Sequence, residues 1–69
     1  MNGDVFRGHW QQLKGDIKRR WIRLTDEDLD SIDGAMDKLE GRLEERYGWG
    51  KEQAVRELET WARERGVWL

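Results

Sequence analysis

The segment Leu39–Tyr47, LEGRLEERY, decides the fold, because it repeats the earlier segment Leu13–Trp21, LKGDIKRRW, at an offset of twenty-six residues. The offset matches apolar with apolar residues and glycine with glycine: Phe6 and Ile32, Gly8 and Gly34, Trp10 and Met36, Gly15 and Gly41, and Ile17 and Leu43. Arg20 likewise matches Arg46. One helical packing surface is therefore used twice.

The charged residues between these positions reverse sign from the first copy to the second. The reversed pairs are Lys14 and Glu40, Asp16 and Arg42, Lys18 and Glu44, and Arg19 and Glu45. Met1–Leu24 holds six basic and two acidic residues, whereas Thr25–Leu69 holds seven basic and thirteen acidic residues. We therefore expect the basic flank of the first helix to face, within the fold, the acidic stretch that contains Glu40, Glu44 and Glu45.

The length and composition favour one small intracellular domain, residues 1–69. A chain of 69 residues is near the lower limit at which a hydrophobic core is stable without disulfides, metal or oligomerisation. It has no cysteine, which excludes a disulfide framework and is typical of the reducing cytosol. No apolar run approaches the ~18 residues of a membrane span, and the N-terminus lacks the apolar region of a secretory signal. We expect a soluble, cytoplasmic protein.

A first helix is predicted from about Val5 to Arg23, with Asp4 as its cap. Apolar residues recur there every three or four positions, which places them on one helical face: Phe6, Trp10, Leu13, Ile17, Trp21 and Leu24. Basic side chains flank this apolar stripe, so their stems can lie along its edge with the charges in water. The pattern is that of an amphipathic helix.

A second helix is predicted to begin at Thr25. The Thr25 hydroxyl can accept from the first turn, Asp28 sits where a capping-box acid reaches back, and Leu24 with Leu29 supplies a hydrophobic staple. Acidic residues in the first turn also favour the positive end of the helix dipole. This second helix is short and acidic.

Further along, a bend near Ser31–Gly34 precedes a main helix from about Asp33 to Tyr47. Gly48 is a left-handed stop, and a last helix follows Gly50. Gly66 is expected to end that helix, leaving Val67–Leu69 to dock or to fray. The predicted fold is thus all-α, a small bundle of three main helices plus one short acidic helix. Its shared core is expected to contain Trp10, Trp21, Leu39, Leu43 and Trp61.

Four glycines of the repeat, Gly8, Gly15, Gly34 and Gly41, are unusual for helices. A glycine within a helix costs roughly 0.5–1 kcal/mol relative to alanine, and these four fall opposite the apolar stripe. They are tolerated surface positions, sites of a second helix contact, or part of a partner surface. The residues alone leave these alternatives open.

Catalytic and metal-binding chemistry lacks its usual parts. The alternating acids of Asp26–Asp30 look like half a calcium loop, but Ser31 stands where that loop needs glycine, and a capped helix explains the acids. His9 is the only histidine and has no cysteine or second imidazole to accompany it. We expect no cofactor and no enzymatic activity, with His9 at the surface or at a helix boundary.

The basic flank of the first helix is a candidate surface for an anionic partner. Its residues are Lys14, Lys18, Arg19, Arg20 and Arg23, and they surround an aromatic residue, as nucleic-acid surfaces do. The isoelectric point near 5.4 opposes nucleic-acid binding. Charge matching within the fold is the preferred interpretation, with nucleic acid or a membrane surface as alternatives.

The combined spacing of these residues resembles the CsbD-like family of small bacterial stress-response proteins. The residues that carry the resemblance are Gly8-x-Trp10-x-Gln12-x-Lys14-Gly15-x-Ile17-Lys18-x-x-Trp21-x-x-Leu24-Thr25-Asp26, Ile32-x-Gly34, and Leu39-x-Gly41-x-Leu43-x-Glu45-Arg46-Tyr47-Gly48. The resemblance extends from Gly8 to about Trp61. Departures are His9 in place of a usual Asn, Gly50 in place of a common hydroxyl cap, and a tail from Arg63 that follows no family pattern.

The resemblance implies a small helical protein that accumulates under general or osmotic stress, with no catalytic residues to transfer. The expected role is that of a non-enzymatic structural or interaction protein. Its partner is unknown, and both another protein and a second copy of the chain fit this expectation. The alternative is binding to nucleic acid or an anionic surface through the basic first helix.

Overall fold

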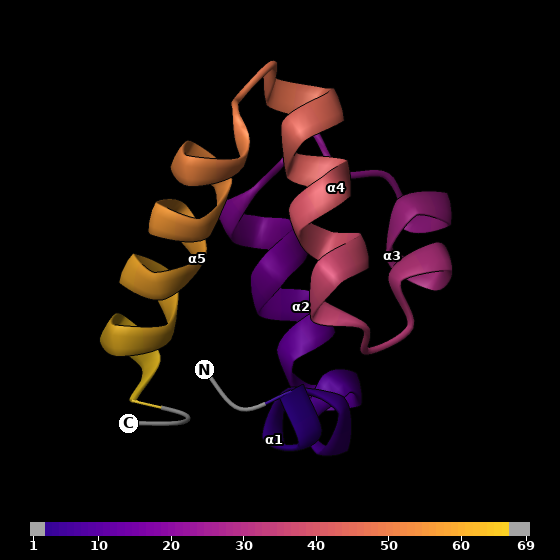
Figure 1. Cartoon of the computed structure of the whole chain (residues 1–69). Helices are drawn as coiled ribbons and strands as arrows, with labels where there is room; N and C mark the ends of the chain where they lie inside the picture. Colours follow the sequence, from indigo (N-terminus) through magenta and orange to yellow (C-terminus); the bar gives the residue numbers. More distant parts are fainter. Residues whose placement is uncertain (1–2, 67–69) are drawn as a thin grey trace.

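A computed structural model describes residues 3–66, which form helices joined by short turns (Figure 1). The helices are α1 (Gly3–Gly8), α2 (Trp10–Arg20), α3 (Asp26–Ile32), α4 (Met36–Tyr47) and α5 (Lys51–Arg65). The predicted all-α class is confirmed, with α2, α4 and α5 as the main helices and α3 as the short acidic one. The tail Val67–Leu69 lies outside the described residues.

The first predicted helix is divided in two, which the sequence pattern did not indicate. His9 has φ −105° and ψ 10°, so α2 restarts after it. The His9 ring Nδ1 lies 3.0 Å from the Val5 carbonyl oxygen, which the His9 backbone N–H also approaches at 3.1 Å. His9 is therefore an exposed boundary residue, as expected. Asp4 lies inside the first turn of α1 rather than before it.

On the N-terminal side of the break, Phe6 is fully buried, and its ring centroid lies 5.5 Å from that of Trp10. At its other end α2 stops at Arg20, three residues before the predicted end. Trp21 leaves the helical conformation with φ −116° and ψ 82°, and the Leu24 N–H donates to its carbonyl at 3.0 Å. This turn returns Leu24 to the core.

The internal repeat is a structural repeat. The caps of α2 and α4, His9 and Ala35, are twenty-six residues apart, the same offset as in the sequence. Each carbonyl accepts from the residue four positions later, Leu13 at 2.9 Å and Leu39 at 3.1 Å. Each half of the repeat is thus a short helix, a break and a longer helix.

The two breaks lie against each other. Gly34, at the α3–α4 break, is buried and has φ 82°, and a Cβ there would come within 3.3 Å of the Arg7 Cα. A glycine is therefore required at this position for both backbone conformation and close approach. For Gly34 the close approach fits the second helix contact, one of the three alternatives that the sequence left open, although the residue lies in a turn. A Cβ at Gly8, Gly15 or Gly41 would meet nothing within 4 Å.

The boundaries of the acidic helix follow its capping residues. Thr25 is the cap of α3, and both bonds of its capping box with Asp28 are formed, as predicted. Asp33 ends α3 with φ 42°. The prediction that the next helix begins at Asp33 is wrong, because two successive left-handed residues, Asp33 and Gly34, delay α4 until Met36. Gly48 and Gly66 end α4 and α5 at φ 67°, as predicted.

One hydrophobic core joins the helices. α4 lies between α3 and α5 in Figure 1, and α2 passes behind it. The buried apolar residues are Phe6, Trp10, Leu13, Ile17, Trp21, Leu24, Leu29, Ile32, Leu39, Leu43, Ala54, Leu58, Trp61 and Ala62. They include all five predicted core residues. Trp21 and Trp61 meet at 5.9 Å between ring centroids, which joins the end of α2 to α5.

Candidate functional site

The basic flank of α2 is paired with acids of neighbouring helices. The Lys14 Nζ lies 3.4 Å from Asp30 Oδ1, and Lys18 forms an ion pair with Asp26. Both acids belong to α3. The pairs are largely exposed to solvent, with the acids 74 % and 78 % exposed. The short acidic helix therefore neutralises the lysines of α2.

The three arginines of the candidate surface also have partners. Arg20 Nη1 lies 2.7 Å from Glu64 Oε2 on α5, and Arg19 Nη2 lies 2.6 Å from Asp16 Oδ1 within α2. Arg23 places its guanidinium 5.4 Å from the Tyr47 ring centroid and donates to the Arg46 carbonyl oxygen at 3.4 Å.

The prediction that these cations face Glu40, Glu44 and Glu45 is wrong. The ion pairs of this flank are with Asp30, Asp26, Asp16 and Glu64. Glu45 accepts from Arg42 of its own helix at 3.2 Å. Burial raises the pKa of Glu40, and the cation that opposes this shift is Lys51 rather than a residue of α2. The turn after α2 brings α3, rather than the acidic side of α4, alongside the lysines. Charge matching occurs within the fold, but with different acids.

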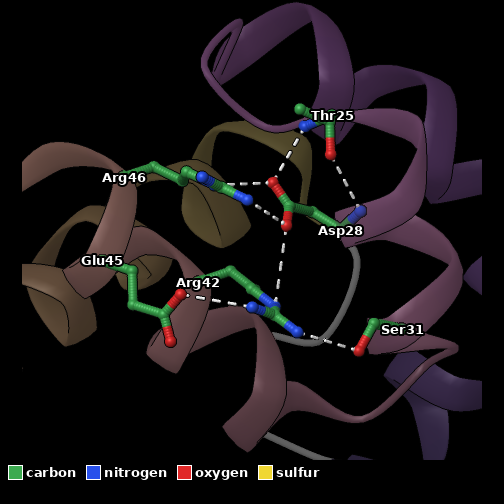
Figure 2. Close-up of polar contacts among 6 residues, drawn as sticks. All are labelled: Thr25, Asp28, Ser31, Arg42, Glu45 and Arg46. Carbon is green, nitrogen blue, oxygen red and sulfur yellow. Dashed lines mark hydrogen bonds and ion pairs between the residues drawn. The ribbon is translucent and has the colours of Figure 1, made fainter.

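The most buried charged residue among residues 4–66 is Asp28 (Figure 2), which is 3 % exposed. Its Oδ2 accepts from the Thr25 N–H at 3.0 Å and from Arg46 Nε at 2.9 Å. Its Oδ1 accepts from Arg46 Nη2 at 2.9 Å, and Arg42 Nε lies 3.7 Å away. We call Thr25, Asp28, Arg42 and Arg46 the Asp28 cluster.

The Asp28 cluster holds its acid in the ionised form. The hydrogen bonds from Arg46 lower the pKa of Asp28 well below its ordinary value, against the opposing effect of burial, and the bonds from Thr25 add to the lowering. A two-pronged bond from arginine to carboxylate also fixes geometry. The cluster therefore joins the start of α3 to the end of α4.

Sequence reasoning found the Thr25–Asp28 cap but missed Arg46 and Arg42, because they are fourteen or more residues away on another helix. One signal was present in the repeat. Arg20 and Arg46 occupy equivalent positions and keep their charge while their neighbours reverse sign. Both make ion pairs to another helix, Arg20 to Glu64 and Arg46 to Asp28.

An open groove of about 270 Å³ lies beside the Asp28 cluster, between α3 and α4. Its lining residues are Ser31, Lys38, Gly41, Arg42 and Glu45. Arg42 spans the groove wall, with Nη2 donating to the Ser31 hydroxyl at 3.1 Å and Nη1 to Glu45 at 3.2 Å (Figure 2).

No three His, Cys, Asp or Glu side chains within residues 4–66 gather closely enough to hold a metal ion. Among helices α1 to α5, none combines the length and the apolar character needed to cross a membrane.

Comparison with known proteins places this chain in a family. The sequence model described as CsbD-like matches residues 4–56. The chain is 55 % identical over 58 residues to the UPF0337 protein PA4738 of Pseudomonas aeruginosa, covering 84 % of this chain and 89 % of that protein. It is 46 % identical over 61 residues to the UPF0337 protein YjbJ of Escherichia coli K12, covering 88 % of each. No solved structure matches it significantly. The chain belongs to the CsbD-like family.

Proposed function

We propose that this chain acts in the bacterial cytoplasm during stress as a non-enzymatic structural or interaction protein, folded as a single domain over residues 1–69. The stress-response role follows from its family, as the sequence resemblance implied. The remainder of the proposal is supported by what the polar side chains do. Several of them connect one helix to another: Lys14 and Lys18 pair with acids of α3, Arg20 pairs with Glu64 of α5, and Arg46 pairs with Asp28.

The single observation that carries the proposal is the use of Asp28. A general base works best when its pKa lies near the operating pH. The Asp28 pKa is instead far below that range, and its oxygens accept from Thr25 and Arg46. Asp28, the most buried carboxylate among the described residues, therefore forms an ion pair between α3 and α4 and is a poor proton acceptor.

Dose dependence in cells tests the absence of catalysis. A binding or structural protein acts stoichiometrically, so survival of stressed cells that lack the chromosomal copy should rise in proportion to the amount of protein supplied. An Asp28→Asn variant should protect in proportion to its folded fraction. Full protection at trace amounts of protein would contradict the proposal, because only turnover allows a few molecules to act on many.

Nucleic-acid or anionic-surface binding through Lys14, Lys18, Arg19, Arg20 and Arg23 is the second candidate. One observation favours it: Arg19 is 78 % exposed although it pairs with Asp16. A phosphate would have to compete with the acids that already pair with this flank. Titration with duplex DNA at low and moderate salt tests it, because phosphate neutralisation gives a steep salt dependence. Binding that persists at moderate salt and is lost in Arg19→Gln would favour this candidate.

A further inference from the structure

We propose that the groove between α3 and α4 binds an oxyanion of the phosphate class, held by Lys38, Arg42 and the Ser31 hydroxyl. Such a site goes beyond the proposed function, because it gives the chain a small ligand, and its residues are distinct from the basic flank of α2. Three features of the groove support it: an incomplete series of ion pairs, unused hydrogen-bond donors and an open floor.

α4 carries a row of basic side chains on the side that contacts α3. The basic row consists of Lys38, Arg42 and Arg46, which are four residues apart and therefore neighbours on the helix surface, where like charges repel. In the first half of the repeat the equivalent positions hold glutamine, aspartate and arginine. Positive charge is therefore concentrated in this way in the second half, and it needs acids nearby.

The acids of α3 neutralise only one end of the basic row. Asp28 accepts from Arg46 at 2.9 Å and lies 3.7 Å from Arg42. About one turn further along α3 the residue is Ser31, so a hydroxyl occupies the place where a second acid would continue the pairing. Lys38 forms no ion pair with the side chains of residues 4–66. An anion bound beside Ser31 would supply the missing negative charge.

The same side chains have hydrogen-bond donors that no acceptor in the described part of the chain uses. Ser31 Oγ accepts from Arg42 Nη2 at 3.1 Å, so the hydroxyl hydrogen is left to donate. The Lys38 ammonium carries three N–H donors. The adjacent Asp37 carboxylate accepts instead from the Lys38 backbone N–H, at 3.0 Å. These donors suit the charged oxygens of a phosphate group, which accept hydrogen bonds.

The groove has the size and the charge for a small anion. Its volume of about 270 Å³ is below the roughly 300–1,000 Å³ of pockets for drug-sized ligands. A Cβ at Gly41 would meet nothing within 4 Å, so the floor of the groove is open helix backbone. The lining residues Lys38, Arg42 and Glu45 together carry one net positive charge. Arg42 is already held by Ser31 and Glu45 (Figure 2), so it is ordered before an anion binds.

Glu45 should oppose binding of the anion. Its carboxylate accepts from Arg42 Nη1 at 3.2 Å and is 62 % exposed, so it repels an anion and engages one of the donors. Removal of the Glu45 charge should therefore strengthen the binding of phosphate, whereas removal of the Lys38 charge should weaken it. Two neutral variants of the same groove thus have opposite expected effects.

NMR titration of the whole chain with inorganic phosphate tests the site, at neutral pH and with sodium chloride adjusted to keep the ionic strength constant. The amide shifts of Ser31, Gly41 and Arg42 should change and saturate. Lys38→Gln should weaken phosphate binding about 5- to 10-fold, because a charge-assisted hydrogen bond is lost. Glu45→Gln should strengthen it about 2- to 5-fold, since an exposed repulsion is removed.

The matched controls are Lys51→Gln and Glu52→Gln, which make the same two changes at exposed residues of α5, outside the groove. Each should bind phosphate within about 2-fold of the original chain, because distant exposed charges are screened. Circular dichroism melting verifies that all four variants are folded. Shifts that do not saturate overturn the inference, as does a Lys38→Gln chain that binds phosphate as tightly as the original.

A second titration with glycerol phosphate distinguishes the sources of the phosphate group. Binding at least as tight as that of inorganic phosphate would assign the site to phosphate esters, and weaker binding would assign it to the free ion; either result supports the site. Dose-proportional protection of stressed cells by a chain that binds no phosphate would still support the proposed function.

Discussion

The two halves of the repeat, α1–α2 and α3–α4, share their packing and differ in their ion pairs. The equivalent residues Ile17 and Leu43 are both completely buried. Next to them, Asp16 of α2 pairs with Arg19 at 2.6 Å, and Arg42 of α4 pairs with Glu45 at 3.2 Å. The second pair occupies the equivalent positions with both charges reversed.

This difference shows how strictly each interaction constrains the sequence. A core position needs a side chain of given shape, because the interior is close-packed. These ion pairs each have one exposed partner, Arg19 and Glu45, and they need only opposite charges, so either order of acid and base is possible. The buried Asp28 is again constrained, because without Arg46 only the Thr25 N–H and the more distant Arg42 would compensate its carboxylate for lost hydration.

The largest effect should come from the shared core. Leu43→Ala and Ile17→Ala should each lower the free energy of unfolding by about 2–5 kcal/mol, because each leaves a cavity. Urea denaturation followed by circular dichroism measures this, and exposed Ile22→Ala is the control. If only one of the two core variants is destabilised, the halves are not equivalent in packing.

A smaller loss of stability should follow removal of the buried Asp28 charge, which belongs to the second half of the repeat. Asp28→Asn should lower the free energy of unfolding by about 1–3 kcal/mol at neutral pH, since it removes charged hydrogen bonds to Arg46. Because the folded-state pKa of Asp28 is depressed, its contribution is present above the unfolded value of about 3.9 and is lost as the pH falls below that value.

The cost of Asp28→Asn should therefore shrink in acid, and denaturation at several pH values measures it. The control is Asp30→Asn, which removes the same charge from an exposed site and should stay within about 0.5 kcal/mol. A cost for Asp28→Asn that is independent of pH would contradict the role assigned to its charge.

Loss of the α3 cap should lower the free energy of unfolding by less than loss of the Asp28 charge. Thr25→Ala should cost about 0.5–2 kcal/mol, because the Asp28 N–H loses the hydroxyl that accepts from it at 3.1 Å. Thr25→Ser keeps that oxygen and should be nearly silent in thermal melting. Equal losses in both variants would mean that the methyl group, and not the hydroxyl, matters here.

Short sequence motifs predicted the helix boundaries that depend on contacts between neighbouring residues. Thr25 with Asp28 marked the start of α3, and Gly48 and Gly66 marked helix ends, since these depend on residues a few positions apart. The break at His9 could not be predicted this way. Phe6 and Trp10 keep the helical spacing across it, and the change in backbone conformation serves the fit of α1 against Gly34.

The partners in ion pairs between helices could not be predicted from the sequence for a related reason. Opposite charge is necessary for an ion pair but does not determine which acid is the partner. Lys14 was predicted to face the acids of α4, whereas it lies beside Asp30 of α3. The Arg46–Asp28 bond was missed although Arg46 kept its charge within the repeat. The positive charge that Arg20 and Arg46 share, where neighbouring repeat positions reverse sign, was a better guide to an ion pair between helices than the reversed charges were.

The smallest change in stability is expected for the ion pair of Lys14, and it should distinguish the observed partner, Asp30, from Glu40, which was expected from the sequence. Lys14→Glu should destabilise the fold slightly at low salt, and adding Asp30→Lys should restore the pair with reversed charges. The matched control adds Glu40→Lys instead, at the acid that occupies the equivalent repeat position. A double-mutant cycle should give a coupling of about 0–1 kcal/mol for positions 14 and 30, because both side chains are solvent-exposed, and this coupling should fall as salt rises. A larger coupling between positions 14 and 40 would contradict the observed contact between α2 and α3.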